Sequence, residues 1–281
     1  MKDMPRITIV TPSYNQGQYL EETIVSVLSQ DYPNLEYFVL DGGSNDNSVE
    51  IIKKFSDRID WWVSEKDNGQ TDAINKGFRR ATGDLLCWVN SDDLLLPGCL
   101  REIAQCYIEE GRPDLIHSNM VFIDSNSYIL RAIRIPKQTR FFMERGVWSV
   151  SAPTSFFSRA LMEQVGFLNE KYHIAMDMDI WMRMIIASGK IAKVNNYLGA
   201  FRWHELSKST LDLKSKRFKN QENPENKEIF NNFLKSSSQS KRYWWRKIWQ
   251  IYQLLNLNYI RAFLNTQAIG GKALFDVFPF K

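Results

Sequence analysis

Cysteine and long apolar runs are scarce in this chain. Its 281 residues include 3 cysteines, at positions 87, 99 and 106, and none of them forms a Cys-x-x-Cys pair. This odd number without metal-site spacing argues against a disulfide framework and against a zinc site. No segment reaches the roughly 20 apolar residues of a transmembrane helix, and no secretory signal precedes the strand expected at residues 7–10. We therefore expect a cytoplasmic protein.

The glycine-rich loops that hold phosphates in many nucleotide-binding proteins are also missing. The first expected strand leads into Pro12-Ser-Tyr-Asn-Gln-Gly17, whereas a dinucleotide site would show Gly-x-Gly-x-x-Gly there. A loop ending in Gly-Lys-Ser or Gly-Lys-Thr is absent as well. A diphosphate bound by this chain would therefore need another partner, and a metal ion could supply it.

The net charge of +4 is unevenly distributed along the sequence. Residues 201–281 carry 15 Lys and Arg against 6 Asp and Glu, a net charge of +9, so residues 1–200 are near −5. This asymmetry suggests two regions with different partners. No nucleic-acid-binding motif accompanies the basic residues, so we do not expect nucleic acid to be one of them.

Short apolar runs alternate with amphipathic segments through the first hundred residues. Strands are expected at residues 7–11, 35–40, 59–63 and 85–89, and helices at 20–28, 49–55 and 71–80. This alternation predicts an α/β fold with a mostly parallel, doubly wound sheet flanked by helices. Beyond Pro97 we expect a helix at 100–108 and a hairpin of strands at 115–124 and 128–135.

Polar residues follow the carboxyl ends of the expected strands, namely Asn15, Asp41, Glu65 and Asp92. Because the carboxyl ends of parallel strands share one edge of a sheet, these side chains should converge on one nucleotide crevice. Oxygen ligands suit Mg2+ or Mn2+, and we expect Asp92 and Asp93 to face such an ion. An alternative is an acidic turn that only caps the next helix.

Five motifs, in order, resemble glycosyltransferase family 2, whose members are inverting nucleotide-sugar enzymes with a GT-A fold. They are Ile9-Val-Thr-Pro-Ser-Tyr-Asn15, Val39-Leu-Asp-Gly-Gly-Ser-Asn-Asp46, Asp67-Asn-Gly-Gln-Thr-Asp-Ala-Ile-Asn-Lys-Gly77, Asn90-Ser-Asp-Asp93 and Ala175-Met-Asp-Met-Asp-Ile-Trp-Met-Arg183. The resemblance covers about residues 5–210 and implies a GT-A fold there. We therefore expect one catalytic domain over residues 1–210, with a nucleotide-binding half at residues 1–96 and an acceptor half at residues 97–210.

The resemblance also implies which residues hold the donor. The residues expected at the base and ribose are Pro12, Ser13, Tyr14, Asn15 and Asp41. Asp72 and Lys76 are expected close to the nucleotide, although Lys76 could instead be a solvated helix residue. Asn90, Ser91 and Asp92 match the Asp-x-Asp metal signature, with Asn90 standing where many relatives have the first Asp. An amide can still accept a hydrogen bond from ribose.

The helix expected around residue 180 contains two acids, Asp177 and Asp179, for which we predict different roles. Asp179 and Arg183 are four residues apart and can pair on one helix face, whereas Asp177 cannot share that face. Asp177 is therefore free to point into the cleft, and the resemblance gives it the role of catalytic base. Met176 departs from the family, which usually has Glu at this position.

The segment around residue 204 should supply positive charge to the site. A lone histidine is more often a buried structural residue, but the resemblance implies that His204 lies beside the metal or the diphosphate. Arg202 and Lys208 would then stabilise the leaving diphosphate. The resemblance also places the acceptor over a segment that contains Trp148, Pro153 and Thr154.

The last part of the chain is expected to lie outside the catalytic domain. Residues 211–240 are polar and could form a linker or a mobile lid. Residues 241–281 should be a basic, aromatic helical extension with an apolar stripe at Trp244, Ile248, Ile251, Leu255 and Tyr259. Three hypotheses remain for this stripe: docking on the catalytic domain, a homodimer, or peripheral attachment to an anionic membrane such as the inner face of the plasma membrane.

Together these features predict an inverting transferase that moves a sugar from a nucleoside diphosphate sugar, with UDP-sugar favoured, to an acceptor hydroxyl. A glycan or lipid-linked acceptor, in bacterial surface polysaccharide or glycolipid synthesis, fits the resemblance. One alternative is a sugar-phosphate nucleotidyltransferase, which would have no use for a lone base at Asp177. Another is a non-catalytic module that binds a sugar nucleotide or glycan.

Overall fold

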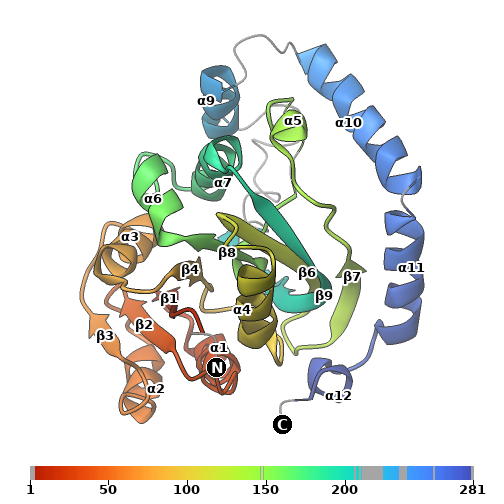
Figure 1. Cartoon of the computed structure of the whole chain (residues 1–281). Helices are drawn as coiled ribbons and strands as arrows, with labels where there is room; N and C mark the ends of the chain where they lie inside the picture. Colours follow the sequence, from red (N-terminus) through yellow and green to blue (C-terminus); the bar gives the residue numbers. More distant parts are fainter. Residues whose placement is uncertain are drawn as a thin grey trace.

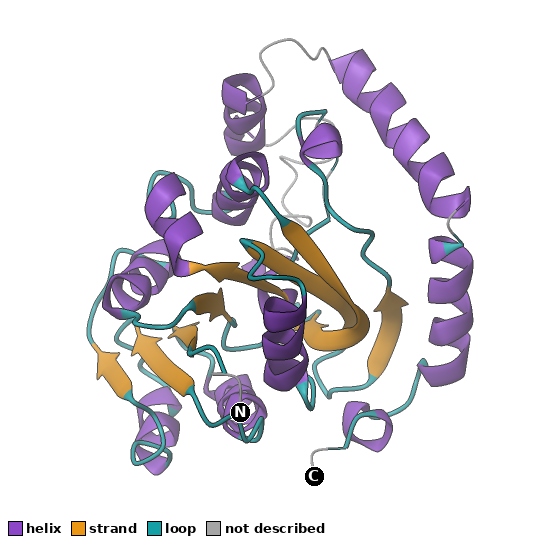
Figure 2. Ribbon diagram, viewed as in Figure 1, coloured by secondary structure: helices purple, strands orange, loops and turns teal. Residues whose placement is uncertain are grey.

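The fold is an α/β domain with a mixed sheet between two layers of helices, followed by a helical segment along one side (Figure 1). Figure 2 shows the sheet at the centre of the molecule and the helices around it. This computed structural model describes residues 4–145, 147, 149–205, 207–208, 210, 224–233, 239–255 and 257–279. The expected fold class is confirmed.

The first half of the chain builds a parallel sheet. Its strands lie in the order β3-β2-β1-β4, and all three pairings are parallel. Each expected strand is present within two residues of its predicted bounds. The elements are β1 (Ile7–Ser13), α1 (Gly17–Leu28), β2 (Leu35–Asp41), α2 (Ser48–Lys54), β3 (Trp61–Ser64), α3 (Gln70–Arg80) and β4 (Leu85–Trp88).

The second half extends the same sheet with mixed pairing. β8 is antiparallel to β4 and to β6, while β6 is parallel to β9. β6 and β7 form the expected antiparallel hairpin. The elements are β5 (Leu94–Leu95), α4 (Cys99–Glu109), β6 (Leu115–Ile123), β7 (Ile129–Ile133), α5 (Arg140–Met143), the 3-10 turn η1 (Ala152–Thr154), β8 (Ser155–Ser158), α6 (Arg159–Val165), α7 (Met176–Ala187) and β9 (Ile191–Arg202).

Both faces of the sheet are buried, which explains why its strands are almost continuously apolar. Successive residues of a strand point to opposite faces. Val10 therefore joins a core formed with α3, α6 and α7, whereas Ile9 joins a second core formed with α1, α2 and α4. In the first core Trp88 stacks on Trp181, with ring centroids 4.9 Å apart. This contact fixes α7 to the end of β4, and the two motifs of chemical interest lie at the start of α7 and in the loop directly after β4.

The strand ends are aligned across the parallel half. Ser13 lies opposite Asp41 in the β1/β2 pair, and Asp41 lies opposite Ser64 in the β2/β3 pair. The polar segments that follow these strands therefore begin at the same level of the sheet. The predicted convergence of the strand ends on one edge is confirmed.

Part of the expected linker is instead a packed helix. Residues 224–233 form α9 (Pro224–Phe233), and its Ile229 and Phe230 are buried in the core beside α7. A polar composition was compatible with this helix because two apolar residues suffice to anchor one face. The other residues of the expected linker up to residue 238 lie outside the described part of the chain.

The expected helical extension at the carboxyl end consists of three helices among its described residues. They are α10 (Gln239–Leu255), α11 (Asn258–Ile269) and α12 (Leu274–Val277). Leu257, with φ 55°, has the left-handed conformation between the first two. Within the described ranges, none of the helices is both long and apolar enough to cross a bilayer.

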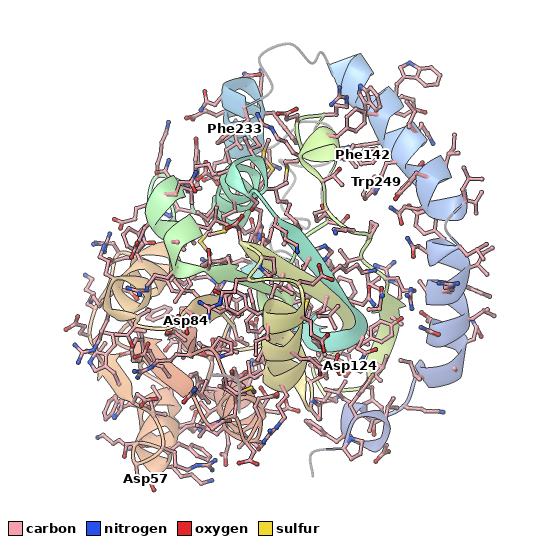
Figure 3. All side chains as sticks on the ribbon, in the orientation of Figure 1. Asp57, Asp84, Asp124, Phe142, Phe233 and Trp249 are labelled. Atoms are coloured by element: carbon pink, nitrogen blue, oxygen red, sulfur yellow. The ribbon has the colours of Figure 1, made fainter. Side chains whose placement is uncertain are left out.

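α10 rests on the domain through a face that the sequence did not single out. Trp249 is buried against Phe142, with ring centroids 4.4 Å apart (Figure 3), and Trp245 contacts Phe141. α11 lies beside β7, where the backbone N–H of Ala132 donates to the Thr266 hydroxyl at 3.0 Å. The predicted apolar stripe of residues 244, 248, 251, 255 and 259 faces away and is exposed.

Candidate active site

A cavity of about 600 Å³ opens at the carboxyl edge of the parallel strands. This volume is within the usual range for a small-molecule site. Residues from both halves of the domain line it, namely Pro12, Ser13, Tyr14, Gln16, Gly42, Lys66, Asp67, Gly69, Gln70, Ala73, Trp88, Asn90, Ser91, Asp92, Ser151, Ala152, His173, Ile174, Met176, Asp177, Phe201, Ser207 and Lys208.

Eight of the predicted site residues line this cavity: Pro12, Ser13, Tyr14, Asn90, Ser91, Asp92, Asp177 and Lys208. They come from the ends of β1 and β4, the start of α7 and the segment after β9. The cavity therefore brings together four predicted parts of the site: the residues after β1, the loop of residues 90–93, which we call the metal loop after the ion predicted there, the base Asp177 and the cation Lys208. The remaining predicted residues within the described ranges lie behind its wall or beside it.

Asp41 and Asn15 shape the cavity wall from behind. The Asp41 carboxylate is buried and accepts hydrogen bonds from the backbone N–H of Ser44 at 2.9 Å and from the Ser64 hydroxyl at 2.7 Å. Asn15, at φ 51°, accepts from the backbone N–H of Asn45 at 2.8 Å. Both side chains thus order the loop after β2, and their contacts to base and ribose stay a prediction.

Asp72 and Lys76 also lie outside the cavity lining. Lys76 forms an ion pair with Glu65, and the Asp72 carboxylate accepts from the backbone N–H of Asn68 at 3.1 Å. The loop that they support, after β3, contributes Lys66 and Asp67 to the cavity instead. The position of Lys66 and Asp67 directly after the third parallel strand could have predicted that they line the cavity.

Asp93 is withdrawn from the crevice that it was expected to face. It is 1% exposed, and its two oxygens accept hydrogen bonds from the Asn90 side chain at 3.0 Å and from the backbone N–H of Arg202 at 3.1 Å. Burial, with a smaller effect from the neighbouring Asp92 charge, raises its pKa well above the usual range. Asp93 thus anchors the turn, and it is not available as a metal ligand.

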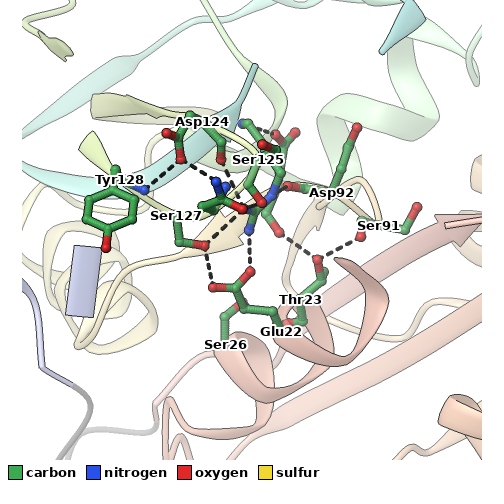
Figure 4. Close-up of polar contacts among 12 residues, drawn as sticks. Glu22, Thr23, Ser26, Ser91, Asp92, Asp124, Ser125, Ser127 and Tyr128 are labelled. Atoms are coloured by element: carbon green, nitrogen blue, oxygen red, sulfur yellow. Dashed lines mark hydrogen bonds and ion pairs between the residues drawn. The ribbon is translucent and has the colours of Figure 1, made fainter. Parts of the chain in front are cut away.

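Arg202 does not face the diphosphate site. Its guanidinium is 0% exposed and forms an ion pair with Glu22 of α1. It also donates to the backbone carbonyls of Asp92 at 2.9 Å and Asp124 at 3.1 Å, and to the Ser127 hydroxyl at 2.9 Å (Figure 4). The expected role in stabilising the leaving group is wrong, because every donating edge of this side chain is held by protein acceptors. Arg202 braces the metal loop from beneath.

The metal loop is also fixed from α1. The Thr23 hydroxyl lies 2.9 Å from the carbonyls of both Ser91 and Asp93 (Figure 4). These contacts use backbone carbonyls only. They fix the loop without occupying the carboxylate of Asp92, which faces the cavity. The loop is therefore preorganised for a ligand at Asp92.

His204 stands beside Asp92. Its Nε2 is 2.9 Å from Asp92 Oδ2, and its ring packs against Tyr19 with centroids 4.8 Å apart. The Nδ1 atom is buried and has no hydrogen-bond partner among the described residues. Figure 4 shows Asp92 at the edge of the polar network that supports the loop.

The donor set at Asp92 fits a divalent ion that is shared with a diphosphate. Mg2+ and related ions are often held by one or two carboxylates together with substrate phosphates. Asp92 and His204 supply two adjacent donors, and the described part of the chain has no group of three or more His, Cys, Asp or Glu that could by itself hold a metal ion. The residues therefore fit an ion that needs the nucleotide to complete its coordination.

Lys208 provides a positive charge in the cavity. Its Nζ donates to the Gln70 side chain at 2.8 Å, and burial lowers its pKa. Gln70 in turn donates to Asn90 at 2.7 Å, so Lys208 is linked to the metal loop through one residue. The predicted place of Lys208 beside the diphosphate site is compatible with this arrangement.

Asp177 opens onto the cavity from the first turn of α7. Burial raises the pKa of its carboxyl group, and a hydrogen bond from the backbone N–H of Met178 at 2.7 Å opposes that shift. No described Lys, Arg or His forms an ion pair with it. A carboxylate in this situation is a stronger proton acceptor than an ordinary aspartate.

The segment that leads to Asp177 is held by α9. The Glu225 carboxylate accepts hydrogen bonds from three successive backbone N–H groups, those of His173, Ile174 and Ala175, at 3.1, 3.0 and 2.8 Å. Burial alone would raise the pKa of Glu225, but these bonds outweigh it and lower the pKa. Sequence reasoning missed this contact, because Glu225 lies in the stretch expected to be a linker.

Asp179 is structural, as its spacing predicted. Its Oδ2 accepts from Arg183 Nε at 3.0 Å and from Arg183 Nη2 at 2.6 Å, and the pair is largely buried. Arg183 also donates to the carbonyls of Val165, Gly166 and Phe167. The pair thus joins α7 to the end of α6.

Replacing Asp179 with Asn should lower stability without abolishing the chemistry. Removing one partner of a buried ion pair is strongly destabilising, but Arg183 keeps its three carbonyl acceptors, so we expect a loss of about 2 to 3 kcal/mol. In thermal unfolding this loss corresponds to a decrease in Tm of roughly 5 to 10 °C. An unchanged Tm would show that the pair does not stabilise α7, and Asp177→Asn provides the matched control on the same helix.

The acceptor residues proposed from the sequence are only partly placed. Pro153 and Thr154 are buried in η1, while their neighbours Ser151 and Ala152 line the cavity. Trp148 lies outside the described residues. Ile174 and Phe201 also line the cavity, and the motifs did not indicate them.

Two solved structures that bind nucleotide sugars share this fold. Staphylococcus aureus TarS residues 1–349 in complex with UDP-GlcNAc superposes with a TM-score of 0.60 at 17% identity, covering 82% of this chain and 71% of that one. The mannosyltransferase PcManGT from Pyrobaculum calidifontis, in complex with GDP-Man and Mn2+, gives a TM-score of 0.55 at 18% identity, covering 83% and 69%. The fold is thus of the GT-A glycosyltransferase type.

Sequence comparison gives the family. Residues 8–166, more than half of the chain, match the model of glycosyl transferase family 2. An uncharacterized glycosyltransferase of Rickettsia typhi is 26% identical over 193 residues, which are 66% of this chain and 60% of that protein. One from Mycobacterium tuberculosis is 29% identical over 187 residues, or 65% and 70%. The chain belongs to glycosyltransferase family 2.

Proposed function

We propose that the protein transfers a sugar from a nucleoside diphosphate sugar to an acceptor hydroxyl with inversion at the anomeric carbon. The observation that carries this proposal is that Asp177, a carboxylate with a raised pKa, opens onto the same cavity as Asp92 and Lys208. One cavity thus contains a base for the acceptor and charged groups for the donor.

The reaction follows from the properties of Asp177. Its carboxylate accepts the proton of the acceptor hydroxyl as that oxygen attacks the anomeric carbon. The bond between this carbon and the diphosphate oxygen breaks in the same step, and the electron pair leaves with the nucleoside diphosphate. One displacement inverts the anomeric configuration, and burial helps because it makes Asp177 a stronger base.

The donor would occupy the edge formed by the strand ends. Pro12, Ser13 and Tyr14 together with Lys66 and Asp67 would surround the base and ribose. Lys208 would lie toward the phosphates. A divalent ion held by Asp92 and His204 would offset the charge of the departing diphosphate when bound.

A UDP-sugar is the donor that we favour, because TarS, with this fold, is bound to UDP-GlcNAc. PcManGT, bound to GDP-Man, makes a GDP-sugar the second candidate. For the acceptor we propose a hydroxyl of a glycan or of a lipid-linked intermediate in surface polysaccharide or glycolipid synthesis. The apolar side chains of Ile174 and Phe201 suit the faces of sugar rings.

A screen of nucleotide sugars tests this proposal. Each is incubated with the protein plus Mn2+ or plus EDTA, and release of the nucleoside diphosphate is measured. We expect slow hydrolysis of at least one donor, dependent on the metal. A protein that leaves every donor intact, but forms pyrophosphate from a nucleoside triphosphate and a sugar 1-phosphate, would instead be a nucleotidyltransferase.

A further inference from the structure

The helices α10 and α11 expose large apolar side chains along their outer side. On α10 these include Trp244, Ile251 and Leu255, which are 66%, 57% and 76% exposed. On α11 they include Tyr259 and Phe263, at 48% and 61%. We call these residues, with Ile248, Ile260 and Leu264, the outer face. Figure 1 shows both helices running along one side of the molecule.

The outer face is distinct from the surface that docks on the domain. Trp249 and Gln253 of α10 are buried at 7% and 3% exposure. Trp244 and the residues that follow it at steps of four, three and four, namely Ile248, Ile251 and Leu255, are all exposed. Such spacing forms one stripe on a helix. α10 is therefore apolar on two sides, and docking covers only one of them. An apolar surface of this extent on a soluble domain usually marks an interaction site.

The charge around the outer face identifies the kind of partner. Residues 239–279 contain 6 Lys and Arg but a single acid, Asp276, which gives a net charge of +5. Lys247 and Arg261 are exposed on the same two helices. A second copy of this segment would bring like charges together with almost no acids to pair them. An anionic surface with an apolar interior complements both the charge and the apolar side chains.

We propose that the outer face of α10 and α11 binds an anionic membrane, lying in the headgroup boundary parallel to its surface. Trp and Tyr side chains suit that boundary because each has an apolar ring and a polar group. The basic side chains would contact lipid phosphates. Because Trp245 and Trp249 fix α10 to α5 of the domain, attachment would hold the whole domain in one orientation.

Flotation of the full-length protein with vesicles tests this proposal. Vesicles of phosphatidylcholine alone are compared with vesicles that contain about 30% phosphatidylglycerol, at low and high salt. We expect binding to the anionic vesicles that salt weakens, and little binding to the neutral ones.

Two charge-matched double variants separate the outer face from net charge. Ile251→Glu with Phe263→Glu changes one outer-face residue on each helix. Gln250→Glu with Gln105→Glu adds the same charge at exposed polar positions outside the outer face, one on α10 and one on α4. We expect the outer-face pair to bind anionic vesicles at least tenfold more weakly than the control pair, with both pairs keeping the wild-type Tm.

Three outcomes would overturn the proposal. The folded wild-type protein could fail to bind either kind of vesicle, or the two double variants could bind equally. The wild-type protein could also be a dimer by light scattering that only the outer-face pair converts to a monomer, without vesicle binding, in which case a second copy covers the face. None of these results depends on catalytic activity, so failure here is distinguishable from failure of the proposed reaction.

Discussion

Asp177→Asn lowers the rate of sugar transfer by about 100-fold or more, because general base catalysis typically contributes 100- to 10,000-fold. Asn keeps the size of the side chain but cannot accept the acceptor proton. Donor binding should remain near the wild-type value, since the residues proposed to contact the nucleotide come from other elements of the cavity. Steady-state kinetics with the donor found in the screen, together with calorimetric titration of its nucleoside diphosphate, measures both quantities.

Stability gives this variant an internal control. Burial raises the folded-state pKa of Asp177 above its unfolded value. The native state then binds protons more strongly, so the contribution of this group to stability is lost as pH rises through the folded pKa. At neutral pH the buried Asp177 carboxylate therefore destabilises the folded state. The neutral Asn side chain removes this destabilisation, so the Tm should be unchanged or higher. Transfer at nearly the wild-type rate by a folded variant would mean that another group is the base.

Asp92→Asn weakens donor binding in the presence of Mn2+ by roughly 100-fold, the upper end of what altering a metal's surroundings usually costs. Binding in EDTA should be weak for both proteins and change little between them. The turn itself should survive, since Arg202 and Thr23 contact backbone carbonyls of this loop. Titration of UDP or GDP into both proteins, with Mn2+ and with EDTA, gives the four affinities.

A substitution of His204 tests whether this residue contributes to the effect of Mn2+ on nucleotide binding. His204→Ala should also reduce the benefit of Mn2+, because its Nε2 lies beside Asp92. Equal affinity of the wild-type protein for nucleotide with Mn2+ and with EDTA would remove the metal from the mechanism. Lys208 would then be the main partner of the diphosphate in this cavity.

Much of the parallel half could be predicted from the sequence because its signals are local. Strands buried on both faces read as short apolar runs, and aligned parallel strands bring the residues that follow them to one edge. Asp92 and Tyr14 reach the cavity for that reason. The pairing of Asp179 with Arg183 was predictable because helical spacing of four residues fixes which side chains meet.

The misplaced residues depend on contacts that are remote in sequence. Arg202 is basic and close to a motif, but its guanidinium is directed by Glu22, 180 residues earlier. Asp93 adjoins Asp92, the proposed metal ligand, yet a hydrogen bond from the backbone N–H of Arg202 directs the Asp93 carboxylate inward. No periodicity or spacing reports such partners, so the sequence could indicate the charge of these side chains but not their direction.

The docked side of α10 also depends on a contact that is remote in sequence. α10 has apolar residues on two sides, and sequence periodicity emphasised the stripe through Trp244 and Leu255. Which side docks is decided by Phe141 and Phe142 of α5, about a hundred residues earlier, which receive Trp245 and Trp249. The docked side of α10 could therefore be predicted only from the position of α5 in the fold.

The proposed reaction is a single displacement at the cavity that contains Asp177. Proton NMR of the first sugar released during slow hydrolysis of an α-linked nucleotide sugar tests it most directly, before the anomers interconvert. A single displacement by water predicts that the β anomer is released first, and Asp177→Asn should suppress its release. Initial release of the α anomer would show retention of configuration and would contradict the assignment of Asp177 as the base of an inverting transfer.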